Sequence, residues 1–183
     1  TMYTREAIRH CRQCGASVAY RLPDDGDTKL RAICTACHTV HYENPLNVVG
    51  TVPHWGDQVL LCKRNIKPRK GKWTLPAGFM ELQETTAEGA ARETVEEAGA
   101  QFTMGPLFSL INVARVGQVH LFYRAQLLST DFDPGHETME ARLFAEAEIP
   151  WDDIAFRTVK ETLTRYFADR RLGQFGTHVV DIT

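Results

Sequence analysis

The sequence lacks the features that would direct it to a membrane or a secretory pathway. No apolar run approaches the roughly 18 residues that a bilayer-spanning helix needs, and the first residues, TMYTREAIRH, contain no apolar stretch of the kind found in signal peptides. An excess of one charge is also missing, since 21 basic and 23 acidic residues leave a formal net charge of −2. We therefore expect a soluble cytoplasmic protein without general attraction for membranes or nucleic acids.

The sequence also contains no internal repeat and no low-complexity segment, and its composition is that of a globular protein. Residues 2–45 have too few large apolar residues to build a core alone. Residues 46–172 interleave strand-like runs with two helical segments, which predicts an α/β layered domain. Residues 173–183 fit either a tail or an added edge strand.

Strand-like runs are recognised by their β-branched and aromatic residues and by the turn residues that bound them. Runs 47–55 and 58–64 predict one hairpin, and runs 108–116 and 118–128 predict another. The remaining predicted elements are a short strand at 73–78, a helix from Thr85 to Gly99, a loop at 131–142, a strand at 141–149 and a helix at 156–171.

Four of the five cysteines form two C-x-x-C pairs separated by 19 residues, a spacing typical of a structural zinc ribbon. The predicted zinc ligands are Cys11, Cys14, Cys34 and Cys37. Four thiolates complete the tetrahedron and leave no place for water, so this zinc would fold the segment and not catalyse. His38 and His41 are alternative ligands, while Cys62 lies in an apolar run and is assigned to the core.

The segment that follows Gly78 carries a high density of carboxylates. On a helical wheel Arg92, Glu93, Glu96 and Glu97 share one arc, and a set of alanines with Val95 occupies the other, so we expect the alanine side to pack. Glu93 and Glu97 are like charges at i and i+4 and repel each other, whereas a hard divalent cation bound between them would turn this repulsion into attraction for the metal. The pattern therefore favours a Mg²⁺ (or Mn²⁺) site for phosphate chemistry, although a solvated charged helix also fits it.

Residues 78–100 resemble in full the Nudix box, G-x5-E-x7-R-E-U-x-E-E-x-G-U, with U an aliphatic residue. Every Gly, Glu and Arg position is filled, and only Thr94 and Ala100 depart from the aliphatic positions. The resemblance implies a Nudix α/β/α sandwich around a mixed sheet, and a substrate that is a nucleoside diphosphate linked to a moiety X. It also implies that Glu93, Glu96 and Glu97 bind the metal.

The resemblance extends over about residues 11–168 to zinc-ribbon Nudix proteins that act as ADP-ribose or FAD pyrophosphatases and release AMP. NADH-cleaving relatives carry an SQPWPFP-type motif that residues 105–120 lack, so a dinucleotide pyrophosphatase is the alternative. The proline that marks many ADP-ribose hydrolases is also missing around residues 113–116. A non-catalytic ADP-ribose- or nucleic-acid-binding module is a third possibility. Enzymes of this type are often homodimers, which we expect here.

Further site residues are predicted, and for several of them an ordinary surface or core position is the alternative. Glu84 and Arg92 would brace the metal ligands, and Glu137, with Glu140 nearby, would supply a loop carboxylate, although both also fit ordinary surface acids. The predicted substrate contacts are Arg64, Gly78, Trp73 and Phe79. Arg64 is preferred among the cations Lys63, Arg64, Arg69, Lys70 and Lys72. The two aromatic rings could stack on a base, but aromatic residues near strands more often belong to the core.

Overall fold

The computed structural model describes residues 5–183, so residues 2–4 of the predicted ribbon lie outside the described part. The chain forms two compact units, one ending at Pro45 and the other spanning Leu46–Thr183. Within residues 5–183 no helix is long and apolar enough to cross a bilayer.

The first unit is a small three-stranded antiparallel sheet with two tight turns. Its strands are β1 (Val18–Arg21), β2 (Arg31–Cys34) and β3 (Val40–His41). Each C-x-x-C pair sits in a turn closed by a backbone hydrogen bond, from Cys11 N to the Ala16 carbonyl and from Cys34 N to the Thr39 carbonyl. Its buried apolar residues are few and small, so the unit needs the thiols to hold it together.

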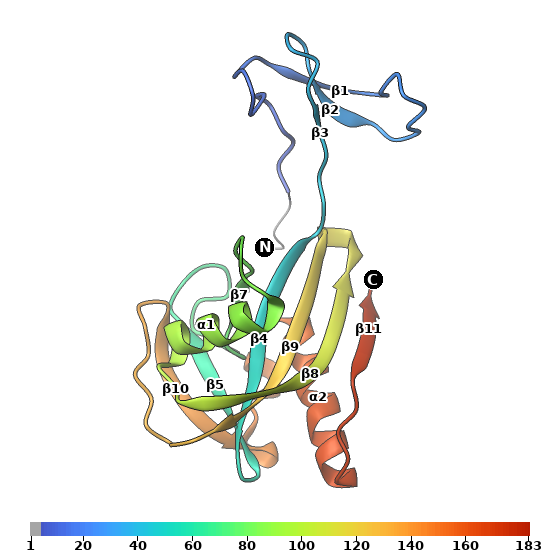
Figure 1. Ribbon diagram of the computed structural model, residues 1–183. Coiled ribbons are helices and arrows are strands. Elements are labelled where there is room, and N and C mark those ends of the chain that lie inside the picture. Colours follow the sequence, from blue (N-terminus) through green and yellow to red (C-terminus); the bar gives the residue numbers. More distant parts are fainter. Residues whose placement is uncertain (1–4) are drawn as a thin grey trace. The chain divides into compact units, whose positions relative to one another are not determined.

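The second unit is built on an eight-stranded mixed sheet (Figure 1). Its strands are β4 (Leu46–Trp55), β5 (Gln58–Arg64), β6 (Trp73–Thr74), β7 (Ala77–Phe79), β8 (Phe102–Val113), β9 (Gln118–Leu127), β10 (Thr138–Ala145) and β11 (His178–Ile182). The path runs β10-β5-β4-β9-β8-β11, with β6 paired to β5 and β7 paired to β4. Two pairs, β4 with β9 and β8 with β11, are parallel, and the others are antiparallel.

The two helices, α1 (Thr86–Ala98) and α2 (Arg157–Leu172), cover opposite faces of this sheet (Figure 1). A 2.7 Å hydrogen bond joins Thr94 of α1 to Thr51 of β4, and a 2.9 Å bond joins Thr162 of α2 to Ser109 of β8. In the sheet register, Thr51 lies beside Tyr123 and Ser109 beside Phe122. Because adjacent residues of a strand point to opposite faces, the predicted α/β/α sandwich around a mixed sheet is confirmed.

The helix caps follow the local sequence. The Thr85 hydroxyl accepts the Glu88 N–H at 3.1 Å, and Gly99 ends α1 in the left-handed conformation. Within residues 173–183, His178–Ile182 form β11 at the edge of the sheet, so this segment is an added edge strand and not a tail. The Asp169 carboxylate of α2 fastens this strand, because it lies 2.7 Å from His178 Nε2 and accepts the Gly176 N–H.

Several predicted elements differ from the structure, and the predicted strands 108–116 and 141–149 end earlier, at Val113 and Ala145. The predicted loop 131–142 ends at Glu137, and β10 starts at Thr138, because this sequence pairs with the edge of β5 through a bulge. The predicted strand 73–78 is divided into β6 and β7. Strands β4 and β5 pair directly only beside their turn, so β6 and β7 fill the gap between them and bring Gly78 next to α1.

Candidate active site

The four predicted zinc ligands meet in the first unit. Their Sγ atoms all lie within 4.8 Å of one another, with 3.7 Å between Cys11 and Cys37 and 3.5 Å between Cys14 and Cys34. Sulfur atoms bound tetrahedrally to zinc at about 2.3 Å stand roughly 3.8 Å apart. The thiols are free and not joined as disulfides, so their spacing and chemistry fit one Zn²⁺.

Hydrogen-bond donors surround these sulfurs. Their positions also show how the two alternative ligands, His38 and His41, relate to the cysteines. The Cys34 sulfur accepts the N–H groups of Ala36 and Cys37. His41 Nε2 lies 3.3 Å from the Cys11 sulfur and is therefore a hydrogen-bond partner of a predicted zinc ligand. The group of four sulfurs within 4.8 Å of one another includes neither His41 nor His38. The structure therefore favours four cysteines over a mixed cysteine and histidine site.

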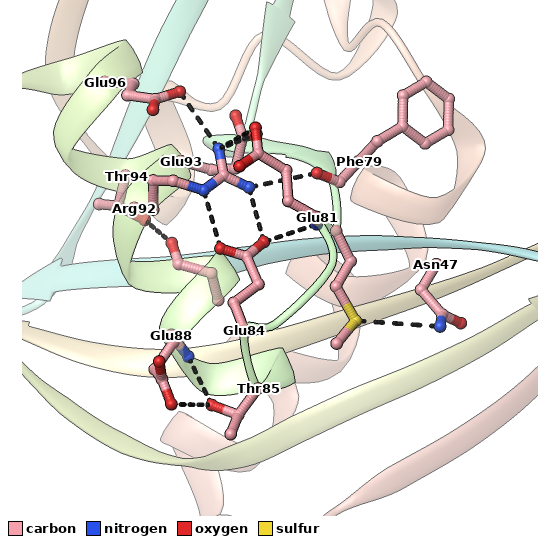
Figure 2. A network of polar contacts seen from close by, with 12 residues as sticks. Asn47, Phe79, Glu81, Glu84, Thr85, Glu88, Arg92, Glu93, Thr94 and Glu96 are labelled. Atoms are coloured by element: carbon pink, nitrogen blue, oxygen red, sulfur yellow. Dashed lines mark hydrogen bonds and ion pairs between the residues drawn. The ribbon is translucent and has the colours of Figure 1, made fainter.

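In the second unit, Arg92 of α1 organises the loop that precedes the helix (Figure 2). Its guanidinium donates to both oxygens of Glu84, at 2.9 and 2.8 Å, and to the Phe79 carbonyl at 3.2 Å. The same group contacts Glu93 at 2.8 Å and Glu96 at 3.3 Å. The hydrogen bond from Arg92 and that from the Glu81 N–H lower the pKa of Glu84 to about 2. Glu84 is therefore a permanent anion that locks loop to helix.

The structure corrects the expected orientation of α1. Its buried residues include Ala90, Glu93, Thr94 and Glu97, whereas Val95 is 53% exposed. The spacing i, i+3, i+4, i+7 from Ala90 defines this packed stripe, and it contains two of the three predicted metal ligands. The expectation that the alanine side packs is thus correct for Ala90 and Ala98, which are fully buried, but wrong for Val95, and it missed the burial of Glu93 and Glu97.

Glu93 reaches its place because Gly78 has no side chain. A Cβ atom on Gly78 would stand 2.3 Å from the Glu93 carboxylate. Burial raises the pKa of Glu93 against the hydrogen bond from Arg92, and the charges of Glu96 and Glu137 add to the rise. A carboxylate held in contact with backbone in this way is placed to bind a cation on its open side.

Gly78→Ala is expected to lower kcat by about 10²-fold while the domain stays folded, because it displaces the Glu93 carboxylate by roughly an ångström. Steady-state kinetics and circular dichroism measure the two quantities. Gly176→Ala is the matched control, because no atom lies within 4 Å of its added Cβ. Equal activity of the two variants would show that the Glu93 position does not matter for turnover.

Glu97 lies one helical turn after Glu93, and 8% of its surface is exposed. Its Oε2 accepts the Ala77 N–H at 3.0 Å. Burial raises the pKa of Glu97 to about 8, opposed by that N–H and assisted by the charge of Glu93. No trio of carboxylates within residues 5–183 is gathered as tightly as the thiols. A cation bound by Glu93 and Glu97 would therefore need water and substrate oxygens, as Mg²⁺ typically does.

The raised pKa of Glu97 predicts a pH dependence of stability in magnesium-free protein. Folded Glu97 keeps a proton that the unfolded state loses near pH 4.5. The contribution of this proton to the free energy of unfolding is therefore fully present below pH 4.5 and is lost as the pH rises toward about 8. The loss approaches roughly 1.4 kcal/mol per pH unit. Urea unfolding between pH 5 and 8 measures it. Glu97→Gln should flatten this slope, and an identical slope in both proteins would contradict the burial argument.

Arg64 and Glu137 approach the same carboxylates from outside α1. Arg64 ends β5, and its guanidinium lies 4.9 Å from the centre of the Phe156 ring. Burial lowers the pKa of Arg64, against the charges of Glu97 and Glu137, which raise it. Glu137 is followed by Thr138, which pairs with Arg64 in the sheet, and the charges of Arg64 and Glu137 both act on Glu97.

The other predicted residues are distributed differently. Lys72 pairs with Asp153 and Lys63 lies over the Trp73 ring, whereas Arg64 donates to the Pro68 carbonyl at 2.9 Å and its charge acts on Glu97. Trp73 is buried in the core against Phe144, which corrects its expected role in stacking on a substrate ring. Phe79 remains 48% exposed at the end of β7, and Glu140 pairs with Arg142. Glu96 is exposed, and its described contact is with Arg92.

Sequence reasoning missed two contributors to this site. The Ala77 N–H, which holds Glu97, belongs to the backbone and leaves no side-chain signal. Asn65 follows Arg64 and binds the segment that carries Glu137. Polar residues are common at strand ends, so the presence of Asn65 there does not predict such a contact.

Both units match known sequence families. The profile of the NUDIX domain matches residues 45–167, and a zinc-ribbon profile described as Nudix N-terminal matches residues 9–43. The crystal structure of a NUDIX hydrolase from Nitrosomonas europaea superimposes with a TM-score of 0.92 at 51% identity, over 96% of this chain and 99% of that one.

Characterised relatives are more distant. The NAD-capped RNA hydrolase NudC of Photobacterium profundum is 28% identical over 88% of this chain and 57% of its own length. An ADP-ribose pyrophosphatase of Methanocaldococcus jannaschii is 27% identical over 60% of this chain and 67% of its own length. The chain thus spans about three fifths of the length of the NAD-capped RNA hydrolases that it matches.

Proposed function

The chain belongs to the Nudix hydrolase family, and from this membership we propose that it is a Mg²⁺-dependent pyrophosphohydrolase that cleaves ADP-ribose, or FAD, with release of AMP. The observation that carries the proposal is the burial of two acids one helical turn apart, Glu93 next to Gly78 and Glu97 next to Ala77, with the charge of Arg64 acting on Glu97. Two buried acids near a cationic side chain suit a substrate that brings both negative charge and a divalent metal.

Each residue of this group has a distinct task in the proposed reaction. Glu93 and Glu97 would hold the metal, which when bound would supply positive charge for the diphosphate and lower the pKa of a water molecule. Arg64 offers a guanidinium to a phosphate oxygen. Glu137 takes the proton from the attacking water, whose oxygen bonds to phosphorus as the bridging oxygen leaves. The exposed Phe79 is placed to contact the base or the moiety X.

A dinucleotide is the second candidate substrate, because four-fifths or more of this chain aligns with proteins named as NAD-capped RNA hydrolases. Residues 105–120 lack the SQPWPFP-type motif of NADH-cleaving relatives, which favours ADP-ribose as the substrate. The ribbon is proposed to bind one Zn²⁺ through its four thiols. A cytoplasmic homodimer stays a prediction, and light scattering that gives the monomer mass would contradict the dimer.

A substrate panel with Mg²⁺ tests the proposal. We would assay ADP-ribose, FAD, NADH, NAD⁺, NAD-capped RNA, diadenosine polyphosphates and nucleoside triphosphates for AMP release. ADP-ribose or FAD is expected to give the highest kcat/KM, and omission of Mg²⁺ should abolish it. Preference for NADH or capped RNA would favour the second candidate. A lack of cleavage across the panel, with binding retained, would indicate a non-catalytic module.

A further inference from the structure

The loop between β9 and β10, residues 128–137, carries Glu137 and is called here the Glu137 loop. Its backbone runs closely against the end of α1. The Asp133 N–H donates to the Ala98 carbonyl at 2.9 Å. A Cβ on Gly135 would stand 2.2 Å from the Glu96 carbonyl oxygen, and one on Gly99 would stand 2.3 Å from the Asp133 carbonyl oxygen. The first half of the loop is therefore docked on the helix that carries Glu93 and Glu97.

The second half of the loop has a different anchor. Asn65 donates its backbone N–H to the Glu137 carbonyl at 2.8 Å and its Nδ2 to the His136 carbonyl at 3.0 Å. One residue thus binds two consecutive carbonyls immediately beside the functional side chain. Asn65 directly follows Arg64, so the end of β5 supplies the proposed phosphate contact with one residue and the loop anchor with the next.

This anchor matters because Glu137 is an exposed loop residue. The loop backbone next to it lies at the end of α1, and Thr138, the next residue, pairs with Arg64, so the charge of Glu137 acts on Glu93, Glu97 and Arg64. A long side chain on an unfastened loop would sample many positions, and the entropy of fixing it would oppose catalysis. Fastening the backbone on both sides of the carboxylate removes much of that cost before substrate arrives.

We infer that Asn65 is a positioning residue, which through its hydrogen bonds to the carbonyls of His136 and Glu137 holds the Glu137 carboxylate against the Glu93 and Glu97 pair. The inference rests on the proposed function for the role of Glu137 in turnover. The holding of the loop by Asn65 is a property of the protein without substrate, and it has its own measurement.

The first measurement is hydrogen–deuterium exchange on the full-length protein. Asn65→Ala removes the bond from Nδ2 to the His136 carbonyl and keeps the backbone bond to the Glu137 carbonyl. This loss is expected to speed exchange in residues 133–138 several-fold, while α1 and the ribbon keep their wild-type rates. Asp131→Asn changes an exposed side chain of the same loop and serves as the matched control. Unchanged exchange in Asn65→Ala would overturn the inference whether or not a substrate is known.

The second measurement is a double-mutant cycle on the best substrate of the panel. Asn65→Ala should lower kcat about tenfold, less than the roughly 10²-fold that an ångström of misplacement costs, with KM changed less than about twofold. In a Glu137→Gln background the same change should have little further effect, since the group that it positions is gone.

Equal kcat losses from Asn65→Ala in both backgrounds would show that Asn65 acts on something other than Glu137, and would overturn the inference. An active Glu137→Gln variant would overturn it through the role of Glu137. If the wild-type protein cleaves nothing in the panel, the proposed function fails, and exchange alone decides whether Asn65 holds the loop.

Discussion

Replacing Glu97 with glutamine is expected to lower kcat by on the order of 10³-fold while the domain stays folded, because a catalytic metal contributes several kcal/mol of transition-state stabilisation. The amide keeps the size of the side chain and an oxygen that accepts the Ala77 N–H. It removes the negative charge that would bind a divalent cation. Since a neutral group is favoured in this buried place, the variant should unfold at a urea concentration at least as high as the wild type near pH 8.

Steady-state kinetics with Mg²⁺ and urea unfolding give the two quantities, and Glu88→Gln on the same helix is the control. Glu88 is exposed and bonded to Thr85, so its loss should cost a few tenths of a kcal/mol in helix stability and no turnover. Undiminished turnover in Glu97→Gln would remove Glu97 from the mechanism. A loss of turnover accompanied by unfolding would instead assign the residue to the core.

The α1 segment shows how far sequence can predict this site. Thr85, Gly99 and the Nudix box determine where the helix starts and ends and which residues carry charge, and all of this was readable in advance. The buried side was predicted only in part, because a helical wheel ranks positions by hydrophobicity: Ala90 and Ala98 are buried as expected, but Glu93 and Glu97 are buried as well. Glu93 and Glu97 are buried against Gly78 and Ala77, two positions outside the helix whose backbone creates the space and the N–H donor.

The surroundings of the box were predicted less well, for a related reason. Trp73 reads equally well as a core residue or a substrate contact, and only the packing of Phe144 against it decides for the core. Thr138 starts a strand because β5 offers it a partner edge, although residues 131–142 have the composition of a loop. Asn65 acquires its role from carbonyls 71 and 72 residues away, which local patterns cannot reveal.

The second large effect is expected in the ribbon. Cys34→Ser should remove the zinc, expected at one ion per chain, and abolish protection of the backbone amides in residues 9–43. Cys34 is fully buried and accepts two backbone N–H groups, so it orders its own turn as well as binding the metal. Zinc binding contributes roughly 10–16 kcal/mol in comparable small domains. The few buried residues of this unit cannot replace that contribution.

Elemental analysis and hydrogen–deuterium exchange of the purified proteins measure these effects, with Cys62→Ala as the control. Cys62 is buried in β5 outside the ribbon, so its variant should keep the zinc and the protection of residues 9–43. Because the second unit has its own apolar core, residues 46–172 should keep their slow exchange in Cys34→Ser. Full zinc retention in Cys34→Ser would mean that another donor, with His41 nearest among the histidines, completes the tetrahedron. Loss of zinc with unchanged exchange would mean that the strands hold without the metal, and the structural role assigned to the four thiols would be wrong.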